Sequence, residues 1–390
     1  MTTPREFDIV VYGSTGFTGR LVAEYLNNEY GVGGDVTWAM AGRSKEKLAA
    51  VRDEMGIPGT VPFVVADAGD PVSLKAMAGR ARVVLTTVGP YQLYGEPLVA
   101  ACADAGTDYV DLCGEPAWMR QMIDKYEAAA KKSGARIVFS CGFDSIPFDL
   151  GVLFAQEEAR KTLGAPATRV KTRVRAMNGT FSGGTLASFK ATMAAAGKDP
   201  SIINLLVDPF CLTPGFKGPD QPAANKPAED PELGWQAPFI MAPINTKNVH
   251  RTNALLGQPY GRDFVYDEMM LAGHGEEGRK MAEFIAGMES MMANDPRKPG
   301  EGPSKDERET GNYDVLIIAE GEGGKSVRVG VTGDRDPGYG STSRMIAESA
   351  ICLVKDVPQG GEGIGTPGSV MGLRLVDRLQ AHAGLTFRVE

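Results

Sequence analysis

A short apolar segment near the start of the chain runs directly into three glycines spaced three residues apart. Residues 8–12 read Asp-Ile-Val-Val-Tyr, and Gly13, Gly16 and Gly19 follow within Gly-Ser-Thr-Gly-Phe-Thr-Gly. A strand, a glycine-rich turn and a helix in this order are typical of a dinucleotide site. Gly13 permits the sharp turn, Gly16 lets backbone N–H groups approach a pyrophosphate, and Gly19 lets the helix pack against the strand. A tight strand-to-helix turn without a ligand is the alternative interpretation.

The whole glycine loop is predicted to hold the phosphates of a bound dinucleotide. The expected helix over residues 17–30 has its positive end at this loop, where backbone N–H groups favour an anion. The predicted cofactor-binding residues of the loop are Gly13, Ser14, Thr15, Gly16, Phe17, Thr18 and Gly19.

The end of the second expected strand indicates which dinucleotide binds. This strand covers residues 36–41, and Arg43 and Ser44 follow it in place of an acidic residue that would accept hydrogen bonds from a ribose 2′-hydroxyl. A guanidinium suits the additional 2′-phosphate of NADP, so we predict NADP(H) as the cofactor. Alternatively, Arg43 belongs to the solvated first turn of the next helix. Asp67, after the third strand, is predicted to face the adenine or to cap a helix.

Short β-branched segments alternate with helical segments over the first 150 residues. This alternation predicts an α/β fold with a Rossmann-like, doubly wound parallel sheet that is covered by helices on both faces. Ligands of such sheets bind beyond the carboxyl ends of the strands. The expected strands are 8–12, 36–41, 61–66, 82–88, 108–112 and 136–140. The expected helices are 17–30, 44–55, 71–79, 95–105 and 116–133.

The composition of the 390-residue chain is that of a globular protein, with 43% hydrophobic and 23% charged residues. A net charge of −8 argues against nucleic acid or an anionic membrane as the main electrostatic partner. No apolar run reaches the roughly 18 residues of a transmembrane helix and no signal-peptide core is present, so a cytoplasmic location is expected. Five cysteines without a CxxC pair, and three histidines without a ligand spacing, predict reduced, mostly buried thiols and no metal site.

Beyond the first 150 residues the pattern indicates two further units. Residues 151–335 are predicted to form a second, α+β domain that binds the substrate. Residues 336–390 are predicted to pack back on the first domain through a helix over 341–356.

Three segments of the second domain have patterns of their own. Residues 209–243 are rich in Pro, Gly and Asn, which predicts a long loop or lid. Residues 262–294 carry many methionines at helical spacing, which predicts a helical segment that contributes adaptable core or a pocket for a flexible acyl chain. Alternating residues 313–319 and 326–332 around a glycine-rich turn predict a hairpin.

Strand-end loops are expected to converge on the nicotinamide end of the cofactor. No tyrosine is followed by a lysine four residues later, so the proton relay of short-chain dehydrogenases is absent. Tyr91, Asp144 and Ser145 are the predicted catalytic residues, as proton donors or hydrogen-bond donors to an oxyanion. Packing or loop capping by Tyr91, and helix capping by Asp144 and Ser145, are the alternatives. The predicted cofactor contacts of the loop before Tyr91 are Val88, Gly89 and Pro90.

Six motifs occur in a fixed order along nearly the whole chain. They are Tyr-Gly-Ser-Thr-Gly-Phe-Thr-Gly at 12–19, Ala-Gly-Arg at 41–43, Val-Gly-Pro-Tyr at 88–91 with Gly95, Tyr-Val-Asp-Leu-Cys-Gly-Glu at 109–115, Gly-Phe-Asp-Ser-Ile-Pro at 142–147 and Asp-Pro-Gly-Tyr-Gly at 336–340. Their combination resembles the saccharopine dehydrogenase-like oxidoreductases, and in particular the branch of trans-acting enoyl reductases.

The resemblance implies a reaction, a cofactor and a partner. It implies NADPH-dependent reduction of the α,β-double bond of a polyketide or fatty-acyl thioester, on a substrate supplied by a synthase that lacks its own reductase domain. An authentic saccharopine dehydrogenase binds a multiply charged substrate and is expected to show clustered arginines. The second domain instead has scattered arginines, which favours a lipid-like substrate: Arg169, Arg173, Arg175, Arg251 and Arg262.

Two other functions stay open at this point. One is a nucleotide-binding scaffold without turnover at a lipid or membrane surface, and the other is an imine or amino-acid oxidoreductase of the saccharopine dehydrogenase type. The oligomeric state is also open, with a homodimer as one alternative, and so is peripheral contact of the protein with a membrane.

Overall fold

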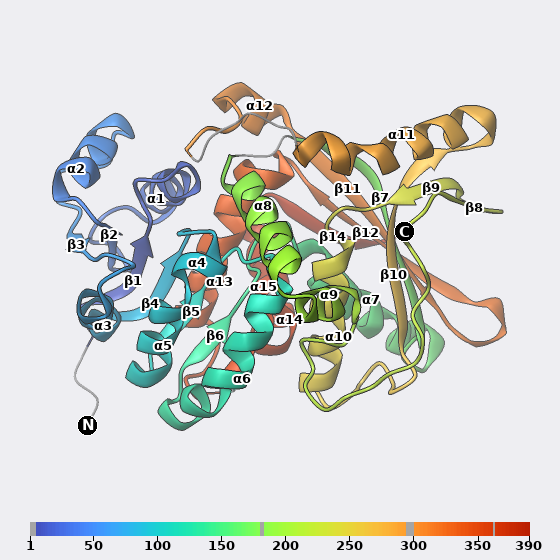
Figure 1. Cartoon of the computed structure of the whole chain (residues 1–390), viewed down its shortest axis with the longest axis horizontal. Coiled ribbons are helices and arrows are strands. Elements are labelled where there is room, and N and C mark those ends of the chain that lie inside the picture. The colour runs from blue at the N-terminus through green and yellow to red at the C-terminus, as the bar shows by residue number, and fades with distance from the viewer. Residues whose placement is uncertain (1–4, 180–182, 294–299, 362) are drawn as a thin grey trace.

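The structure is a computed structural model that describes residues 5–179, 183–293, 300–361 and 363–390. Its described residues form two seven-stranded sheets, which lie beside each other with helices packed around both (Figure 1). The predicted α/β fold with a doubly wound first sheet and a second α+β unit is confirmed.

The first sheet is entirely parallel. In spatial order its strands are β13 (Gly363–Gly365), β6 (Arg136–Val138), β5 (Asp108–Val110), β4 (Ala81–Thr86), β1 (Phe7–Tyr12), β2 (Trp38–Gly42) and β3 (Phe63–Val65). Successive residues of β1 face opposite sides, and both sides are buried: Ile9 and Val11 belong to one core cluster, and Val10 and Tyr12 to the other. A strand that is buried on both faces reads as a continuous apolar run, and this is the pattern that located β1 in the sequence.

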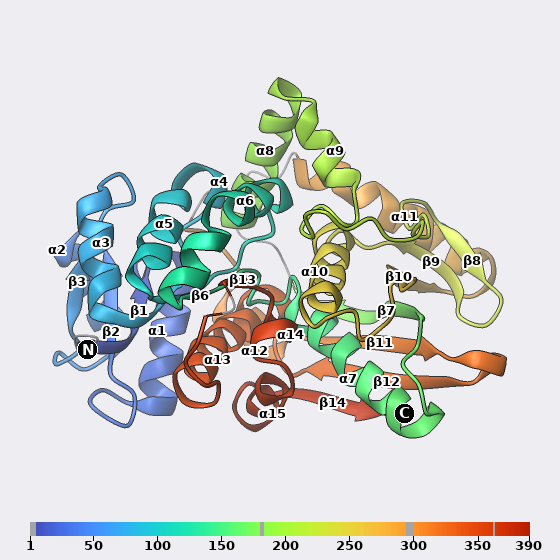
Figure 2. The same ribbon diagram turned by 90° about the horizontal axis from the view of Figure 1, so that it is seen from below.

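Helices cover both faces of this sheet (Figure 2). One face carries α3 (Pro71–Arg80), α5 (Glu96–Ala105) and α6 (Pro116–Ser133), and the other carries α1 (Phe17–Tyr30) and α13 (Thr342–Lys355). The packing of α13 on α1 confirms the predicted return of a C-terminal helix to the first domain. The remaining helices near this sheet are α2 (Lys45–Glu54) and the short α4 (Tyr91–Tyr94).

The second sheet is mixed. In spatial order its strands are β14 (Leu385–Val389), β12 (Ser326–Gly333), β11 (Asn312–Glu320), β7 (Arg169–Asn178), β10 (Val265–Gly273), β9 (Gly234–Pro238) and β8 (Ala228–Asp230). The predicted hairpin is present as β11 and β12, which pair in antiparallel register. The helices of this part are α7 (Ile146–Leu163), α8 (Gly183–Lys198), α9 (Ser201–Val207), α10 (Ala242–Leu255), α11 (Gly275–Ala293) and α12 (Lys305–Thr310). The C-terminal segment adds β13 to the first sheet and β14 to the second, with α14 (Pro367–Val370) and α15 (Leu373–His382) between them.

Two predictions for the second domain are wrong in part. Residues 265–273 of the methionine-rich segment form strand β10, which pairs in parallel with β7, and only α11 is helical. The side chains of Met291 and Met292 lie outside the described residues. The predicted loop 209–243 contains β8 and β9. Residues 265–273 form a strand because they pair with β7, and β9 forms because it pairs with β10. In both cases a tertiary contact overrides the local propensity.

Candidate cofactor and active-site cleft

One large cleft lies where the carboxyl ends of the first sheet meet the second domain. Its volume is about 1250 Å³, and its lining includes residues from all three strand-end loops of the predicted nicotinamide region. Nine of the predicted cofactor-binding residues line it: Gly13, Thr15, Gly16, Phe17, Thr18, Arg43, Asp67, Val88 and Gly89. The other four do not line it: Ser14, Gly19, Ser44 and Pro90.

The glycine loop at one end of the cleft has room only for glycine at two positions. Gly13 has a φ of +95°, in the left-handed region that favours glycine. A Cβ on Gly19 would lie 2.1 Å from the carbonyl oxygen of Gly13, so α1 can approach β1 this closely only without a side chain there. The buried Ser14 hydroxyl donates to the carbonyl of Val11 at 2.6 Å. Gly19 and Ser14 therefore stabilise the conformation of the loop without lining the cleft.

The start of α1 faces the cleft with its backbone N–H groups. Gly16 caps this helix without a side-chain hydrogen bond, and no acidic residue lies in the first turn. The first N–H groups of a helix have no partner inside the helix and carry partial positive charge. The loop therefore fits the pyrophosphate of a dinucleotide, with Phe17 and Thr18 lining the cleft beside it.

Arg43 also lines the cleft, together with Lys47 and Asp67. Arg43 is exposed, and its place fits the contact with a 2′-phosphate that we predict from the sequence. Asp67 accepts a hydrogen bond from the N–H of Gly69 at 2.8 Å, which stabilises its own turn. Ser44 caps α2, because its hydroxyl accepts the N–H of Lys47 at 3.2 Å. Lys47, four residues after Arg43, adds a second cationic side chain to this part of the lining.

Tyr91 lines the middle of the cleft with its ring, while its hydroxyl is engaged by the protein. This hydroxyl donates to the carbonyl of Thr86 at 3.3 Å and accepts the N–H of Leu112 at 3.1 Å. Burial raises the pKa of the Tyr91 phenol well above its usual value. The arrangement matches the loop-capping alternative, in which Tyr91 ties the loop after β4 to the loop after β5.

Glu115 fixes the same region from the next loop. Its buried carboxylate accepts the backbone N–H groups of Tyr91 at 3.0 Å and Gln92 at 2.8 Å, at the start of α4. Burial raises the pKa of Glu115, while these hydrogen bonds and one from Ser188 act in the opposite direction. This role of Glu115 could not be predicted from the sequence, because nothing in the motif at 109–115 shows that α4 begins opposite it.

Asp144 is the one predicted catalytic side chain that is both in the cleft and titratable near neutral pH. It is partly exposed there, and within the described residues no hydrogen bond holds its carboxylate. Burial raises the pKa of Asp144 to about 6. Ser145 is fully buried and does not line the cleft: its hydroxyl accepts from the Asn248 amide at 2.7 Å and contacts Asn245 at 3.3 Å. Ser145 thus joins the start of α7 to α10.

The opposite end of the cleft is apolar. Side chains of β7, α8, α9, α10 and the segment before α10 form it: Met177, Phe189, Met193, Leu206, Ile240, Met241, Pro243 and Ile244. One continuous cavity therefore joins a polar cofactor end to an apolar arm, and Asp144 lies in the loop between them.

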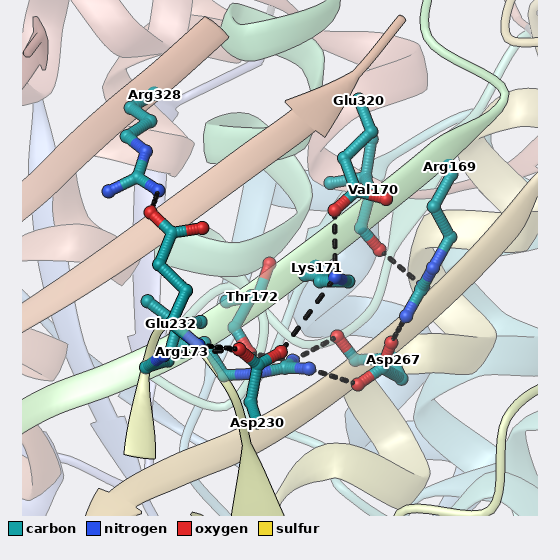
Figure 3. A network of polar contacts seen from close by, with 11 residues as sticks. Arg169, Val170, Lys171, Thr172, Arg173, Asp230, Glu232, Asp267, Glu320 and Arg328 are labelled. Carbon is teal, nitrogen blue, oxygen red and sulfur yellow. Dashed lines mark hydrogen bonds and ion pairs between the residues drawn. The ribbon is translucent and has the colours of Figure 1, made fainter. Parts of the chain in front are cut away.

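The five arginines named above for the second domain are engaged elsewhere, and Figure 3 shows two of them, Arg169 and Arg173. Arg169 pairs with Asp267, and the Arg173 guanidinium lies 2.8 Å from the same carboxylate. Arg175 pairs with Asp314 and Glu390. Two other arginines donate to backbone carbonyls or stack on a ring: Arg251 and Arg262. None of these five lines the cleft, so its apolar arm offers no arginine cluster for a multiply charged substrate.

Other parts of the described chain add two negative findings. No group of three or more His, Cys, Asp or Glu side chains could hold a metal ion in the described ranges. None of the helices that the structure describes combines the length and the apolar composition that crossing a membrane requires. All five cysteines are free and buried, as predicted: Cys102, Cys113, Cys141, Cys211 and Cys352.

Comparison with known proteins agrees with this architecture. Residues 9–138 match the family model of the saccharopine dehydrogenase NADP-binding domain. A Mycobacterium tuberculosis protein, named provisionally as a trans-acting enoyl reductase, is 43% identical over 99% of this chain and 98% of its own length. The trans-acting enoyl reductase of Mycobacterium ulcerans is 37% identical over 96% of each chain.

Two solved structures share the fold at low sequence identity. Saccharopine dehydrogenase (L-Glu forming) from Saccharomyces cerevisiae aligns with a TM-score of 0.55 and 11% identity, over 98% of this chain and 99% of its own. Homospermidine synthase from Legionella pneumophila aligns with a TM-score of 0.56 and 11% identity, over 100% and 92%. The chain therefore belongs to the trans-acting enoyl reductase family of saccharopine dehydrogenase-like oxidoreductases, and its first domain is an NADP-binding domain.

Proposed function

We propose that the protein reduces the α,β-double bond of an acyl thioester with NADPH. The observation that carries the proposal is a continuous cleft that joins a glycine-loop end suited to NADPH to a mainly apolar end and that Asp144 also lines. The names of the relatives support the same reaction. The word trans-acting in these names also supports a substrate that a separate synthase supplies.

Bound NADPH supplies the hydride, which is transferred to the β-carbon of the enoyl group. Asp144 then provides the proton for the α-carbon, so that both carbons become saturated. A carboxyl group with a pKa of about 6 is partly protonated near neutral pH, which an ordinary aspartate is not.

The remaining predicted residues act on the cofactor and on the loops. Arg43 binds the 2′-phosphate, and the start of α1 binds the pyrophosphate. Val88 and Gly89 line the cleft and would hold the nicotinamide half of the cofactor. Tyr91 and Ser145 position the loops that carry the site, since their hydroxyls are bonded within the protein.

Isotope labelling tests this proposal at the level of single atoms. NADPH deuterated at the transferred position should place deuterium on the β-carbon of the product, and reaction in D₂O should place it on the α-carbon. The absence of deuterium from the β-carbon, or an unreduced thioester with NADPH consumed, would contradict conjugate reduction.

A further inference from the structure

One helix, α8, covers the apolar arm and is held to the first domain by polar side chains. Thr185, Ser188 and Thr192 occur at helical spacing on one face of α8. The Thr185 hydroxyl lies 2.9 Å from the hydroxyl of Tyr339, and Ser188 hydrogen-bonds Glu115. These contacts fix the position of α8 relative to the strand-end loops.

The third contact is made from α4. The side-chain amide of Gln92 donates to the Thr192 hydroxyl at 3.0 Å. Two apolar side chains follow the polar ones on the same helix, Phe189 and Met193, and both line the cleft. Thr185, Ser188 and Thr192 line the cleft as well, so α8 presents both polar and apolar side chains to it, and the polar contacts hold the helix in place.

Lys247 holds the opposite wall of the arm in place. Leu206 of α9 and Pro243 at the start of α10 both line the arm. The buried ammonium of Lys247 donates to the backbone carbonyl of Leu206 at 2.8 Å and to that of Pro243 at 2.9 Å. This bridge joins α9 to α10, so that the arm has two fixed walls.

Several apolar side chains that line the cleft are exposed at the surface, while others are buried. Ile244 is only 3% exposed, whereas Met193 is 53% exposed although it lines the same cavity. Leu93 and Tyr94 of α4 line the cleft at 60% and 48% exposure. Val207, next to the lining residue Leu206 on α9, is 72% exposed. The arm therefore ends in an apolar mouth at the surface and not in a buried wall.

We infer that the apolar arm is an open-ended channel through which a long acyl chain leaves the site between α4, α8 and α9. Such a channel favours acyl chains that are long enough to fill it. It sets no upper limit on chain length, because atoms beyond the mouth pass into solvent or to a partner. The inference rests on the proposed function, since it assumes that the acyl group of the thioester occupies the arm.

A series of trans-2-enoyl thioesters of increasing length tests the channel. The kcat/KM should rise by up to about fourfold per added methylene while the chain fills the arm, and then level off without decline. A sharp fall of kcat/KM beyond one length would overturn the inference, because it would show a closed end. A kcat/KM that does not depend on chain length would also overturn it.

A single substitution at the mouth should convert the channel into a closed pocket. Met193→Trp places a larger side chain at a half-exposed position and should lower the ratio of long-chain to short-chain kcat/KM at least about tenfold. Met288→Trp on α11 is the matched control, because Met288 is also exposed but does not line the cleft. An unchanged ratio in Met193→Trp, with the fold retained, would contradict the assigned path.

Binding separates this inference from the proposed reaction. Calorimetry with NADP-loaded protein and saturated acyl thioesters measures the same length dependence without turnover. Length-dependent binding without reduction would reject the proposed reaction and support the channel. Reduction without any length dependence would support the reaction and reject the channel.

Discussion

The two ends of the cleft are built from different parts of the polypeptide. The cofactor end consists mainly of backbone: a glycine loop with a φ of +95° at Gly13, and the N-terminus of α1. The apolar arm consists of side chains from α8, α9 and α10, which are distant in the sequence. A backbone site tolerates almost no added atom, whereas a wall of side chains can change in size without loss of the fold. We therefore expect substitutions to abolish binding at the first end and to shift specificity at the second.

Gly19→Ala should give the largest effect on cofactor binding. Its Cβ would lie 2.1 Å from the Gly13 carbonyl oxygen, so α1 must move away from β1 and the N–H groups that face the pyrophosphate move with it. We expect calorimetry to show at least about a hundredfold weaker NADPH binding. This is the effect of losing two or more charge-assisted hydrogen bonds. Gly79→Ala in α3 is the control, because no atom lies within 4 Å of its added Cβ. NADPH affinity of Gly19→Ala equal to that of the wild type would show that the cofactor end is not a rigid backbone site.

Asp144→Asn tests the junction between the two ends. It keeps the shape of the side chain but removes the proton, so kcat should fall about 10²- to 10³-fold while the Kd for NADPH stays unchanged. Asp124→Asn, an exposed aspartate that pairs with Arg120, serves as the control. Unchanged kcat in Asp144→Asn would exclude Asp144 as the proton donor.

The pH profile gives an independent readout of the same group. An acid must be protonated to act, so kcat of the wild type should be high below pH 6 and fall as the pH rises through the pKa of about 6. Asp144→Asn should lack this fall. A wild-type kcat that instead rises between pH 5 and 7 would indicate a base at this position.

Arg43→Ala should give the smallest effect of the series, because Arg43 is exposed and water partly replaces it. We expect about a tenfold loss of NADPH affinity and little change for NADH, since only NADPH carries the 2′-phosphate. Arg52→Ala on α2, the helix that follows Arg43, is the control, because Arg52 pairs with Asp53 and does not line the cleft. Equal losses for both cofactors would mean that Arg43 does not contact the 2′-phosphate.

The contrast between the backbone-built cofactor end and the side-chain-built arm also explains what could be predicted from the sequence. A glycine spacing, a strand that is apolar on both faces and a cationic residue after β2 are local patterns, and they located β1, α1 and nine residues that line the cleft. The loop after β6 was also identified, because Gly142 and Pro147 mark a turn and a helix start around Asp144.

The second domain depended on contacts that no local pattern reveals. The helix α10 buries polar side chains such as Asn245 and Asn248, so it lacks an amphipathic pattern and was not predicted. Strand β10 was predicted as helix, because its methionines Met269 and Met270 are good helix formers and its pairing with β7 lies almost a hundred residues away. The engagement of the Ser145 hydroxyl by Asn248 has the same cause.

The measurement that tests the central claim most directly follows the absorbance of the reduced nicotinamide with a long-chain trans-2-enoyl thioester, with NADPH and NADH compared at equal concentration. The account predicts that NADPH is consumed in preference to NADH, with one saturated thioester formed per NADPH. Tight NADPH binding without consumption on any enoyl thioester, or consumption only with an amino acid and a 2-oxo acid, would contradict it.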